Sequence, residues 1–468
     1  MTKVPADAMR HARAALKRAS ERGTHLFSNG RYAVMLTAGG SGYSRWGDLA
    51  ITRWREDVTC DVGGTYIFLR DADSGECWSA GYQPRGGEPD SYAAAFTEDR
   101  AEFVRRDGSI ASRLEVIVSA EDDAEVRCVT LTNLGSRTRE IELTSYAEVV
   151  LAPPAADAAH PAFSNLFVRT ECIPERETLL AMRRPRAPDE APPWLAHVLA
   201  VDGETVGALQ WETDRAQFLG RGRGIRSPVS VIDGRALSNT SGPVLDPVVS
   251  LRRRVRVGPG QRVRVTFSTV VAPAREAVLD LAGKYHDVAA FERSATLGRA
   301  RALEQLHRLG IGVDEARLFQ SLASSILYSD PALRGAPEVL SRQTGGPAAL
   351  WAHGISGDHP IVLVEIDEPE DVEIVGQLLR AHEYWRTKCL AVDLVILNDQ
   401  APSDARELQG VLEMLVRPSQ SAAHGEGDKS QGSVFILRAD QVTAPQRDVL
   451  TSVARAVLSG RRGTLAEQ

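Results

Sequence analysis

The stretch "SRLEVIVSAEDDAEVRCVTLTNLGSRTREIELTSYAEVVLA", Ser112–Ala152, decides the fold. Apolar and polar residues alternate through most of it with a period of two, which is typical of strands that turn one face toward a core. The segment "NLGS" at Asn133–Ser136 interrupts this alternation with residues that favour tight turns. We therefore predict long antiparallel strands that are joined by short hairpins.

The same pattern extends in both directions, from about Gly23 to Ala272. Turn segments again separate the strands, at Asp71–Glu76 and Gly258–Gln261. Long strands that meet at short turns over about 250 residues predict a large antiparallel sandwich. The further strand segments are "RYAVMLT", "GTYIFLRD" and "LRRRVRVGPGQRVRVTFSTVVA".

After Pro273 the spacing of apolar residues becomes helical, which predicts a helical linker. From Pro360 onward, apolar strands alternate with amphipathic helices, so we expect a small parallel sheet that helices cover. The last predicted helix is "QRDVLTSVARAVLSGRRG", Gln446–Gly463. The predicted domains are an N-terminal helix at 1–22, the β domain at 23–272, the linker at 273–345, and an α/β three-layer domain at 346–468.

Charge, cysteine content and motifs narrow the functional classes. The chain has 468 residues and a net charge of -7, which does not favour nonspecific nucleic-acid binding. Its five cysteines include no CxxC pair, which argues against a disulfide framework or a zinc site and favours a reducing compartment. We find no HExxH motif and no dinucleotide loop, and therefore predict no metal and no cofactor. A secretory signal and an apolar run of about 20 residues are also absent, so we expect a cytoplasmic chain without a membrane segment.

The segment "GYSRWGDLAITRWRED", Gly42–Asp57, is the first candidate binding site. Sugar rings pack their C–H groups on aromatic faces, and their hydroxyls suit forked polar partners such as arginine and aspartate. The alternative is that these aromatic residues fill the sandwich and the arginines pair with carboxylates at an interface. The candidate carbohydrate-binding residues are Tyr43, Arg45, Trp46, Trp54, Arg55 and Asp57, with a second cluster at Trp78 and Tyr82.

Three other segments receive a structural interpretation. The segment "HGISGDHP" lacks the last glycine of the pattern G-x-S-x-G and precedes a strand, so a structural turn is favoured over a catalytic Ser356. The segment "GRGRG", Gly220–Gly224, has the wrong spacing for a dinucleotide loop. It is either a surface loop or an anion cradle that uses Arg221 and Arg223. The segment "APPAADAAHPAFSNLF", Ala152–Phe167, is predicted to be a long loop.

Several segments together resemble the C-terminal part of cyclic β-1,2-glucan synthases, which belongs to glycoside hydrolase family 94, formerly glycosyltransferase family 36. The 1,2-β-oligoglucan phosphorylases are close relatives. The resemblance implies a β-supersandwich that is related to carbohydrate-binding sandwiches, followed in the family by a helical linker and an (α/α)6 barrel with the general acid and the phosphate site. The segments are "LFSNGRYAVMLTAGGSGYSRWGDLAITRWRED", "GTYIFLRDADSGECWSAGYQP", "DAAHPAFSNLFV", "ALWAHGISGDHPIVLVEID" and "LLRAHEYWRTKCLAVDLVILND".

No residue of this chain matches the catalytic or phosphate motifs of that barrel, so we assign no catalytic residue. We expect a non-catalytic carbohydrate-binding or scaffolding module of a β-1,2-glucan synthase or phosphorylase. The alternatives are an active glycoside phosphorylase or glycosyltransferase, and a purely structural dimer-interface module. The implied partners are β-1,2-glucan or a related oligosaccharide, the barrel of the parent enzyme, and a second copy of the chain. The resemblance also implies further domains of a longer synthase, which would tether the chain to the inner membrane.

Overall fold

The computed structural model describes residues 23–57, 59–187, 190–342, 345–346, 348–400, 405–422 and 432–468. The chain forms two compact units that divide between Leu303 and Glu304. The predicted N-terminal helix at 1–22 lies outside the described residues. The predicted domain boundaries remain predictions, and the two units are described separately below.

Within the described residues, nine strands of the first unit form one antiparallel sheet, in the order β1-β2-β3-β4-β11-β17-β15, with β5 paired to β11 and β6 paired to β5. The long strand β11 pairs with β17 along most of its length. The strands are β1 (Thr24–Ser28), β2 (Tyr32–Thr37), β3 (Gly42–Trp46), β4 (Leu49–Thr52), β5 (Tyr66–Asp71), β6 (Cys77–Ser79), β11 (Arg139–Ala152), β15 (Glu204–Asp214) and β17 (Pro247–Val257).

A second sheet of nine strands has the order β16-β12-β13-β14-β18-β10-β9-β8-β7 in the part of the chain that the structure describes. Within the quoted segment Ser112–Ala152, β9 and β10 form a hairpin of this sheet, whereas β11 belongs to the first sheet. The predicted hairpin at Asn133–Ser136 is therefore wrong, because that turn joins strands of different sheets. The strands are β7 (Ser91–Phe96), β8 (Ala101–Asp107), β9 (Ile110–Val118), β10 (Ala124–Asn133), β12 (Val168–Ile173), β13 (Thr178–Arg183), β14 (Trp194–Asp202), β16 (Gly242–Pro243) and β18 (Arg262–Ala272).

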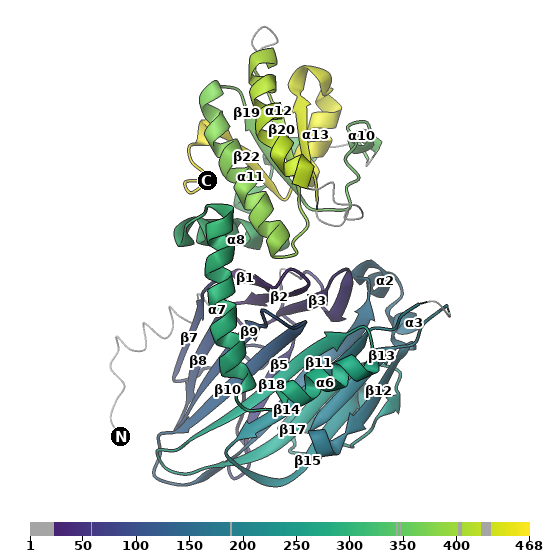
Figure 1. Cartoon of the computed structure of the whole chain (residues 1–468), viewed down its shortest axis with the longest axis vertical. Helices are drawn as coiled ribbons and strands as arrows, with labels where there is room; N and C mark the ends of the chain where they lie inside the picture. The colour runs from purple at the N-terminus through teal and green to yellow at the C-terminus, as the bar shows by residue number, and fades with distance from the viewer. Residues whose placement is uncertain are drawn as a thin grey trace. The chain divides into compact units, whose positions relative to one another are not determined.

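The main core lies between these two sheets. Leu143 and Val149 of β11 and Phe267 of β18 are among its buried side chains. Because alternate residues of a strand face opposite sides, the second sheet also carries apolar residues on its outer face, where α6 (Arg275–Tyr285) packs (Figure 1). Helix α7 (Ala290–Leu309) supplies Phe291 to the same cluster. The two packed antiparallel sheets confirm the predicted supersandwich.

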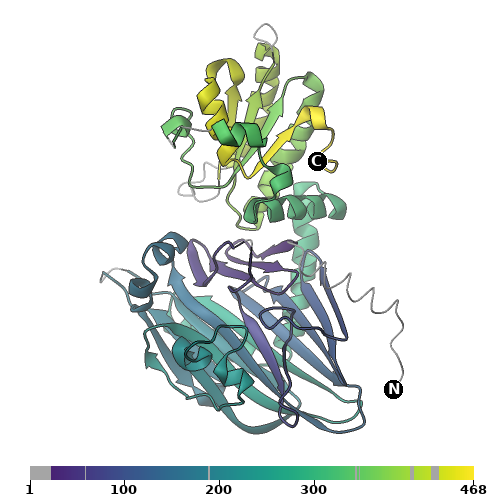
Figure 2. The same cartoon turned by 180° about the vertical axis from the view of Figure 1, so that it is seen from behind.

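The outer face of the first sheet has its own cover, formed by the short helices α4 (Arg215–Leu219) and α5 (Val229–Ile232) (Figure 2). Phe218 of α4 packs against the rings of Phe68 and Tyr146. Near this cover, β4 and β5 pair with successive segments of β11, and the chain between them leaves the sheet. Residues 53–55 and 62–64 are therefore available to form a wall above β11.

The second unit contains a four-stranded parallel sheet in the order β21-β20-β19-β22, with helices on its two faces (Figure 1). Leu363, Val395 and Leu397 form one apolar layer with α10 and α13. The elements are α8 (Val313–Leu327), α9 (Pro337–Arg342), α10 (Ala348–Trp351), β19 (Ile361–Ile366), α11 (Val372–Thr387), β20 (Asp393–Asn398), α12 (Ala405–Ala422), β21 (Val434–Arg438), α13 (Ala444–Val453) and β22 (Ala456–Ser459).

The prediction of one helix over Gln446–Gly463 is wrong at its C-terminal half. Helix α13 ends at Val453, and Ala456–Ser459 forms strand β22, which pairs in parallel with β19. The sequence "AVLS" fits a helix or a strand equally well. Pairing with β19 decides between them because it buries Val457 and Leu458 and satisfies backbone groups that a buried helix end would leave open.

Candidate functional site

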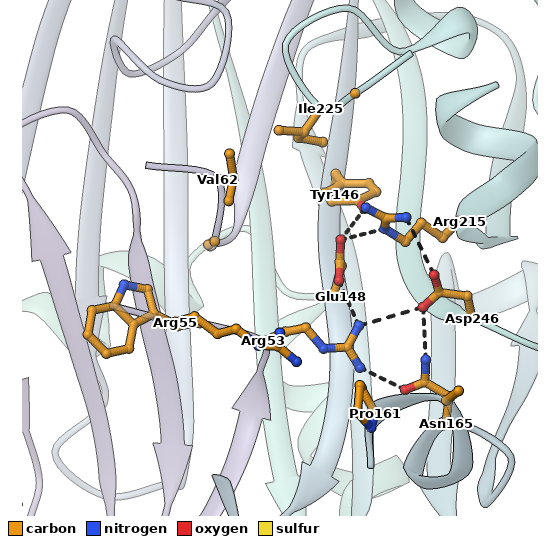
Figure 3. A pocket seen from close by; sticks show the side chains of 15 residues that line it. Arg53, Arg55, Val62, Tyr146, Glu148, Pro161, Asn165, Arg215, Ile225 and Asp246 are labelled. Carbon is orange, nitrogen blue, oxygen red and sulfur yellow. Dashed lines mark hydrogen bonds and ion pairs between the residues drawn. The ribbon is translucent and has the colours of Figure 1, made fainter. Parts of the chain in front are cut away.

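A cavity of about 540 Å3 opens on the outer face of the first sheet, above strand β11 (Figure 3). Ligand sites in proteins commonly have volumes of this order. Four segments that are distant in sequence contribute to its lining: residues 53–55 with 62–64, α3 (Pro161–Asn165), the chain around α4, and Asp246 just before β17. The cavity therefore forms only when the complete sandwich has folded.

Strand β11 supplies the floor through Tyr146 and Glu148. The two residues are two positions apart and so share a face of the strand. Tyr146 belongs to the apolar cluster under α4, and burial raises its pKa well above the ordinary value. Its hydroxyl donates a hydrogen bond to Glu148 Oε1 at 3.0 Å. The floor thus places one carboxylate at the border between an apolar layer and the cavity.

Arg53 links the floor to the helices that follow β11. Its Nη1 donates to Glu148 Oε2 at 2.7 Å, and its Nη2 donates to Asn165 Oδ1 at 2.7 Å. Its Nε and Nη2 form a forked pair with Asp157 at 3.1 and 3.0 Å. Nη1 also lies 3.6 Å from Asp246 Oδ1. A guanidinium has five N–H donors, and each of these five contacts can use one of them.

Glu148 accepts hydrogen bonds from three side chains. Arg215 Nε donates to its Oε1 at 2.6 Å, in addition to the bonds from Arg53 and Tyr146. Burial alone would raise the pKa of Glu148, but the charges and hydrogen bonds of Arg215 and Arg53 outweigh it and hold that pKa below its ordinary value. Glu148 is therefore ionised in the fold and fixed in position.

Asp246 and Arg215 lie at the more open side of the cavity, with side chains 33% and 39% exposed. Asp246 Oδ1 accepts from Asn165 Nδ2 at 3.0 Å, and its Oδ2 lies 3.5 Å from Arg215 Nη1. The backbone N–H of Arg215 also donates to the carbonyl of Asp246 at 3.0 Å. Burial and the nearby Glu148 carboxylate raise the pKa of Asp246, whereas the pKa of Glu148 is lowered.

Comparison with known proteins gives the family. Residues 12–288 match the model of the supersandwich domain of glycosyl hydrolase 94. The chain belongs to this family. The supersandwich fold and the family that the sequence resembles are thereby confirmed.

Two curated relatives are similar to the chain. It is 39% identical over 96% of its length to cyclic β-(1,2)-glucan synthase NdvB of Rhizobium meliloti (strain 1021), and 30% identical over 44% of its length to solabiose phosphorylase of Paenibacillus borealis. The chain spans only 16% and 26% of these two proteins. Among solved structures, a bacterial glucoamylase in complex with acarbose is similar to the chain at 7% sequence identity and a TM-score of 0.38. The alignment covers 67% of this chain and 41% of the glucoamylase chain.

Of the eight candidate sugar-binding residues, Trp54 and Arg55 line the cavity of the supersandwich. Tyr43 is buried beside them, with its ring 5.5 Å from that of Trp54 in an edge-on arrangement. The Arg45 guanidinium lies over the Tyr43 ring, 4.5 Å from its centroid. Tyr43 therefore supports the Trp54 ring without lining the cavity itself.

The other four candidates lie elsewhere in the supersandwich. Trp46 packs against the main core and donates its indole N–H to Asp123 at 2.8 Å. Trp78 is buried in that core, and Tyr82 packs against it. Asp57 accepts hydrogen bonds from Thr59 and Cys60, which lower its pKa to about 2. Carbohydrate binding by any of the eight candidates remains a prediction.

Sequence reasoning found Arg55 but missed the other charged residues of the cavity, Arg53, Glu148, Arg215 and Asp246. Glu148 gave the clearest signal, since it is the only charged residue in the apolar run "YAEVVLA". Asp157 and Asn165 fall in the segment predicted as a loop, which instead contains α2 (Pro154–Ala159) and α3, each with proline in its first turn. Proline fits this position because the first helical N–H groups need no partner within the helix.

The remaining motifs have ordinary structural surroundings. Ser356 accepts a hydrogen bond from the backbone N–H of Asp358 at 3.2 Å in a turn. In the "GRGRG" segment, Gly224 lines the cavity, while Arg223 pairs with Asp233 at 2.8 Å. Among the described residues, no group of three or more histidine, cysteine, aspartate or glutamate side chains is arranged to hold a metal ion. None of the described helices combines the length and apolar character needed to cross a membrane.

Proposed function

We propose that this chain is a carbohydrate-binding module of an enzyme that processes β-1,2-glucan, and that the cavity above β11 is its sugar site. The observation that carries the proposal is the composition of this cavity. Apolar and aromatic walls at Trp54, Val62 and Ile225 face hydrogen-bonding groups at Arg215 and Asp246. Sugar rings present both kinds of surface, C–H faces and hydroxyl edges, and an apolar pocket with a few placed polar groups suits them.

The charges of the cavity favour a neutral ligand. The guanidiniums of Arg53 and Arg215 are balanced there by the carboxylates of Glu148 and Asp246, and Asp157 pairs with Arg53 from behind. Arg55 adds an exposed guanidinium to the lining, so that three arginines meet three carboxylates and the site carries no net charge to attract a free phosphate. The family supports the sugar class, since one relative is named for cyclic β-(1,2)-glucan and another for solabiose. In this proposal, bond-forming chemistry belongs to other parts of a longer protein.

A scaffolding role is the second candidate. It is favoured by Phe163 and Leu166 at the end of α3, whose side chains are 57% and 45% exposed. Exposed apolar residues beside each other commonly mark contact surfaces. The partner surface would be another domain of the parent enzyme or a second copy of the chain. Light scattering measures whether the chain pairs with a second copy, and Phe163→Ser is the variant that tests this surface.

The sugar site is tested by calorimetric titration with cyclic β-1,2-glucan, comparing the native chain with Trp54→Ala. Loss of one aromatic wall should weaken binding about 2- to 10-fold, from a contribution of about 0.5–1.5 kcal/mol. Trp351→Ala is the matched control, because Trp351 is an exposed tryptophan of the second unit. The proposal fails if the native chain gives no heat at millimolar glucan, or if both variants bind as the native chain does. Release of glucose 1-phosphate from glucan and phosphate would instead establish the phosphorylase alternative.

A further inference from the structure

We infer that Arg215 and Asp246 are the two residues that select the ligand, and that together they bind a pair of adjacent free hydroxyls on one sugar ring. In a β-1,2-linked glucan this pair is O3 and O4 of a glucosyl unit. The inference rests on the proposed sugar site and adds to it the contacting residues and the part of the sugar that they recognise.

The first step is that the interior members of the charged network spend most of their hydrogen-bonding capacity on one another. Four N–H donors of Arg53 form hydrogen bonds with Glu148, Asp157 or Asn165, and its Nη1 lies 3.6 Å from Asp246. Glu148 already accepts three hydrogen bonds. The side chains of Arg53 and Glu148 are only 15% and 19% exposed. A ligand that bound either residue would have to replace an existing charge-assisted bond, so both residues serve to position others.

The second step is that Arg215 and Asp246 retain such capacity. Arg215 uses Nε for Glu148 and brings Nη1 within 3.5 Å of Asp246, which leaves its Nη2 donors without a hydrogen bond in the described part of the chain. Asp246 uses Oδ1 to accept from Asn165, while Oδ2 has only the long contact with Arg215. Figure 3 shows the two side chains beside each other at the same side of the cavity. The pair offers free donors next to a free acceptor.

The third step is the chemistry of the ligand. Of two adjacent hydroxyls, one can donate to the carboxylate while the other accepts from the guanidinium, so a diol matches this pair without carrying charge. In a β-1,2-linked chain, O1 and O2 form the linkages, and O3 and O4 are the only adjacent free hydroxyls of an internal unit. An internal β-1,3-linked unit has free O2, O4 and O6, of which no two are neighbours on the ring.

The test uses cyclic β-1,2-glucan, which has no chain ends, so that all its units are internal. Periodate cleaves the C3–C4 bond between the two hydroxyls, and borohydride then reduces the products to alcohols. We expect the ring-opened glucan to bind the full chain at least tenfold more weakly than the intact glucan. Internal units of a long β-1,3-glucan should likewise bind at least tenfold more weakly. Equal binding of the intact and ring-opened glucans would overturn the inference.

Variants assign the contact to the two residues. Asp246→Asn and Arg215→Gln should each weaken binding of intact glucan about tenfold or more, because each removes a charge-assisted hydrogen bond. Arg223→Gln is the matched control, since its pair with Asp233 is exposed and outside the cavity lining. If Arg215→Gln does not fold, Arg215→Lys replaces it in the binding measurement, because lysine keeps the positive charge beside Glu148. If Trp54→Ala weakens binding but none of these cavity variants does, the sugar site stands and the diol contact is refuted. If intact glucan does not bind at all, the proposed function itself fails.

Discussion

Replacing Arg53 by glutamine should destabilise the first unit more than any exposed charge change in the chain. Arg53 connects the end of β4 with β11, α2 and α3 through Glu148, Asp157 and Asn165. The side chains of the three charged members are 15%, 19% and 8% exposed, so water screens these ion pairs only weakly. Glutamine would remove the guanidinium that pairs with Asp157 and one of the two that pair with Glu148.

The expected loss in the free energy of unfolding is about 3–5 kcal/mol, the usual cost of removing one partner from a buried ion pair. For a unit of this size, such a loss lowers the melting temperature by roughly 6–20 °C. Arg223→Gln provides the scale for comparison, because breaking its exposed pair with Asp233 should cost no more than about 1 kcal/mol.

Differential scanning calorimetry of the full chain measures the shift, and hydrogen exchange followed by mass spectrometry locates it. Peptides that cover β11 to α3 should lose protection in Arg53→Gln, whereas peptides of the parallel sheet should not change. The variant should also lose less stability on acidification, because without Arg53 the pKa of Glu148 is no longer held as far below its ordinary value. A melting temperature within 2 °C of the Arg223→Gln control would refute the view that this network holds the cavity together.

Two further predictions concern other parts of the fold. Burial lowers the pKa of His197 from 6.5 to about 3, so the first unit should lose stability as the pH falls from about 6.5 toward 3. In His197→Gln this part of the pH dependence, about 1.4 kcal/mol per pH unit, should disappear from urea unfolding curves. A Cβ on Gly460 would overlap the carboxylate of Asp371, so Gly460→Ala should destabilise the second unit by about 1–3 kcal/mol. Gly376→Ala, inside α11 with open space around it, should instead stabilise that unit by about 0.5–1 kcal/mol in the same measurement.

The strands could be predicted from the sequence because a period of two is a local pattern. Ser112–Ala152 shows that pattern without knowledge of any partner strand, and β9, β10 and β11 follow it. Strand β22 could not be predicted in this way, because four residues are too few to distinguish a period of two from a helical period. Only its parallel register with β19, a strand far back in the sequence, gives it a definite structure.

The charged part of the site could not be predicted, because its members are remote from one another in the chain. The partners of Arg53 lie 95, 104 and 112 positions away. The aromatic content of the candidate segment was more informative, since Trp54 does line the cavity. Composition alone cannot tell a tryptophan on a cavity wall from one between two sheets, and Trp78 is of the second kind.

The distribution of hydrogen-bonding capacity in the network separates binding from support. A network that served stability alone would gain most by satisfying all its members, because each unpaired buried polar group carries a cost. Here the interior members bond mainly to one another, and the more exposed donors and acceptor are on Arg215 and Asp246, where water can reach them. Asn165 and the backbone contact between Arg215 and Asp246 hold these two residues in one arrangement. A ligand would then bind groups that are already ordered, so little conformational entropy would be lost on binding.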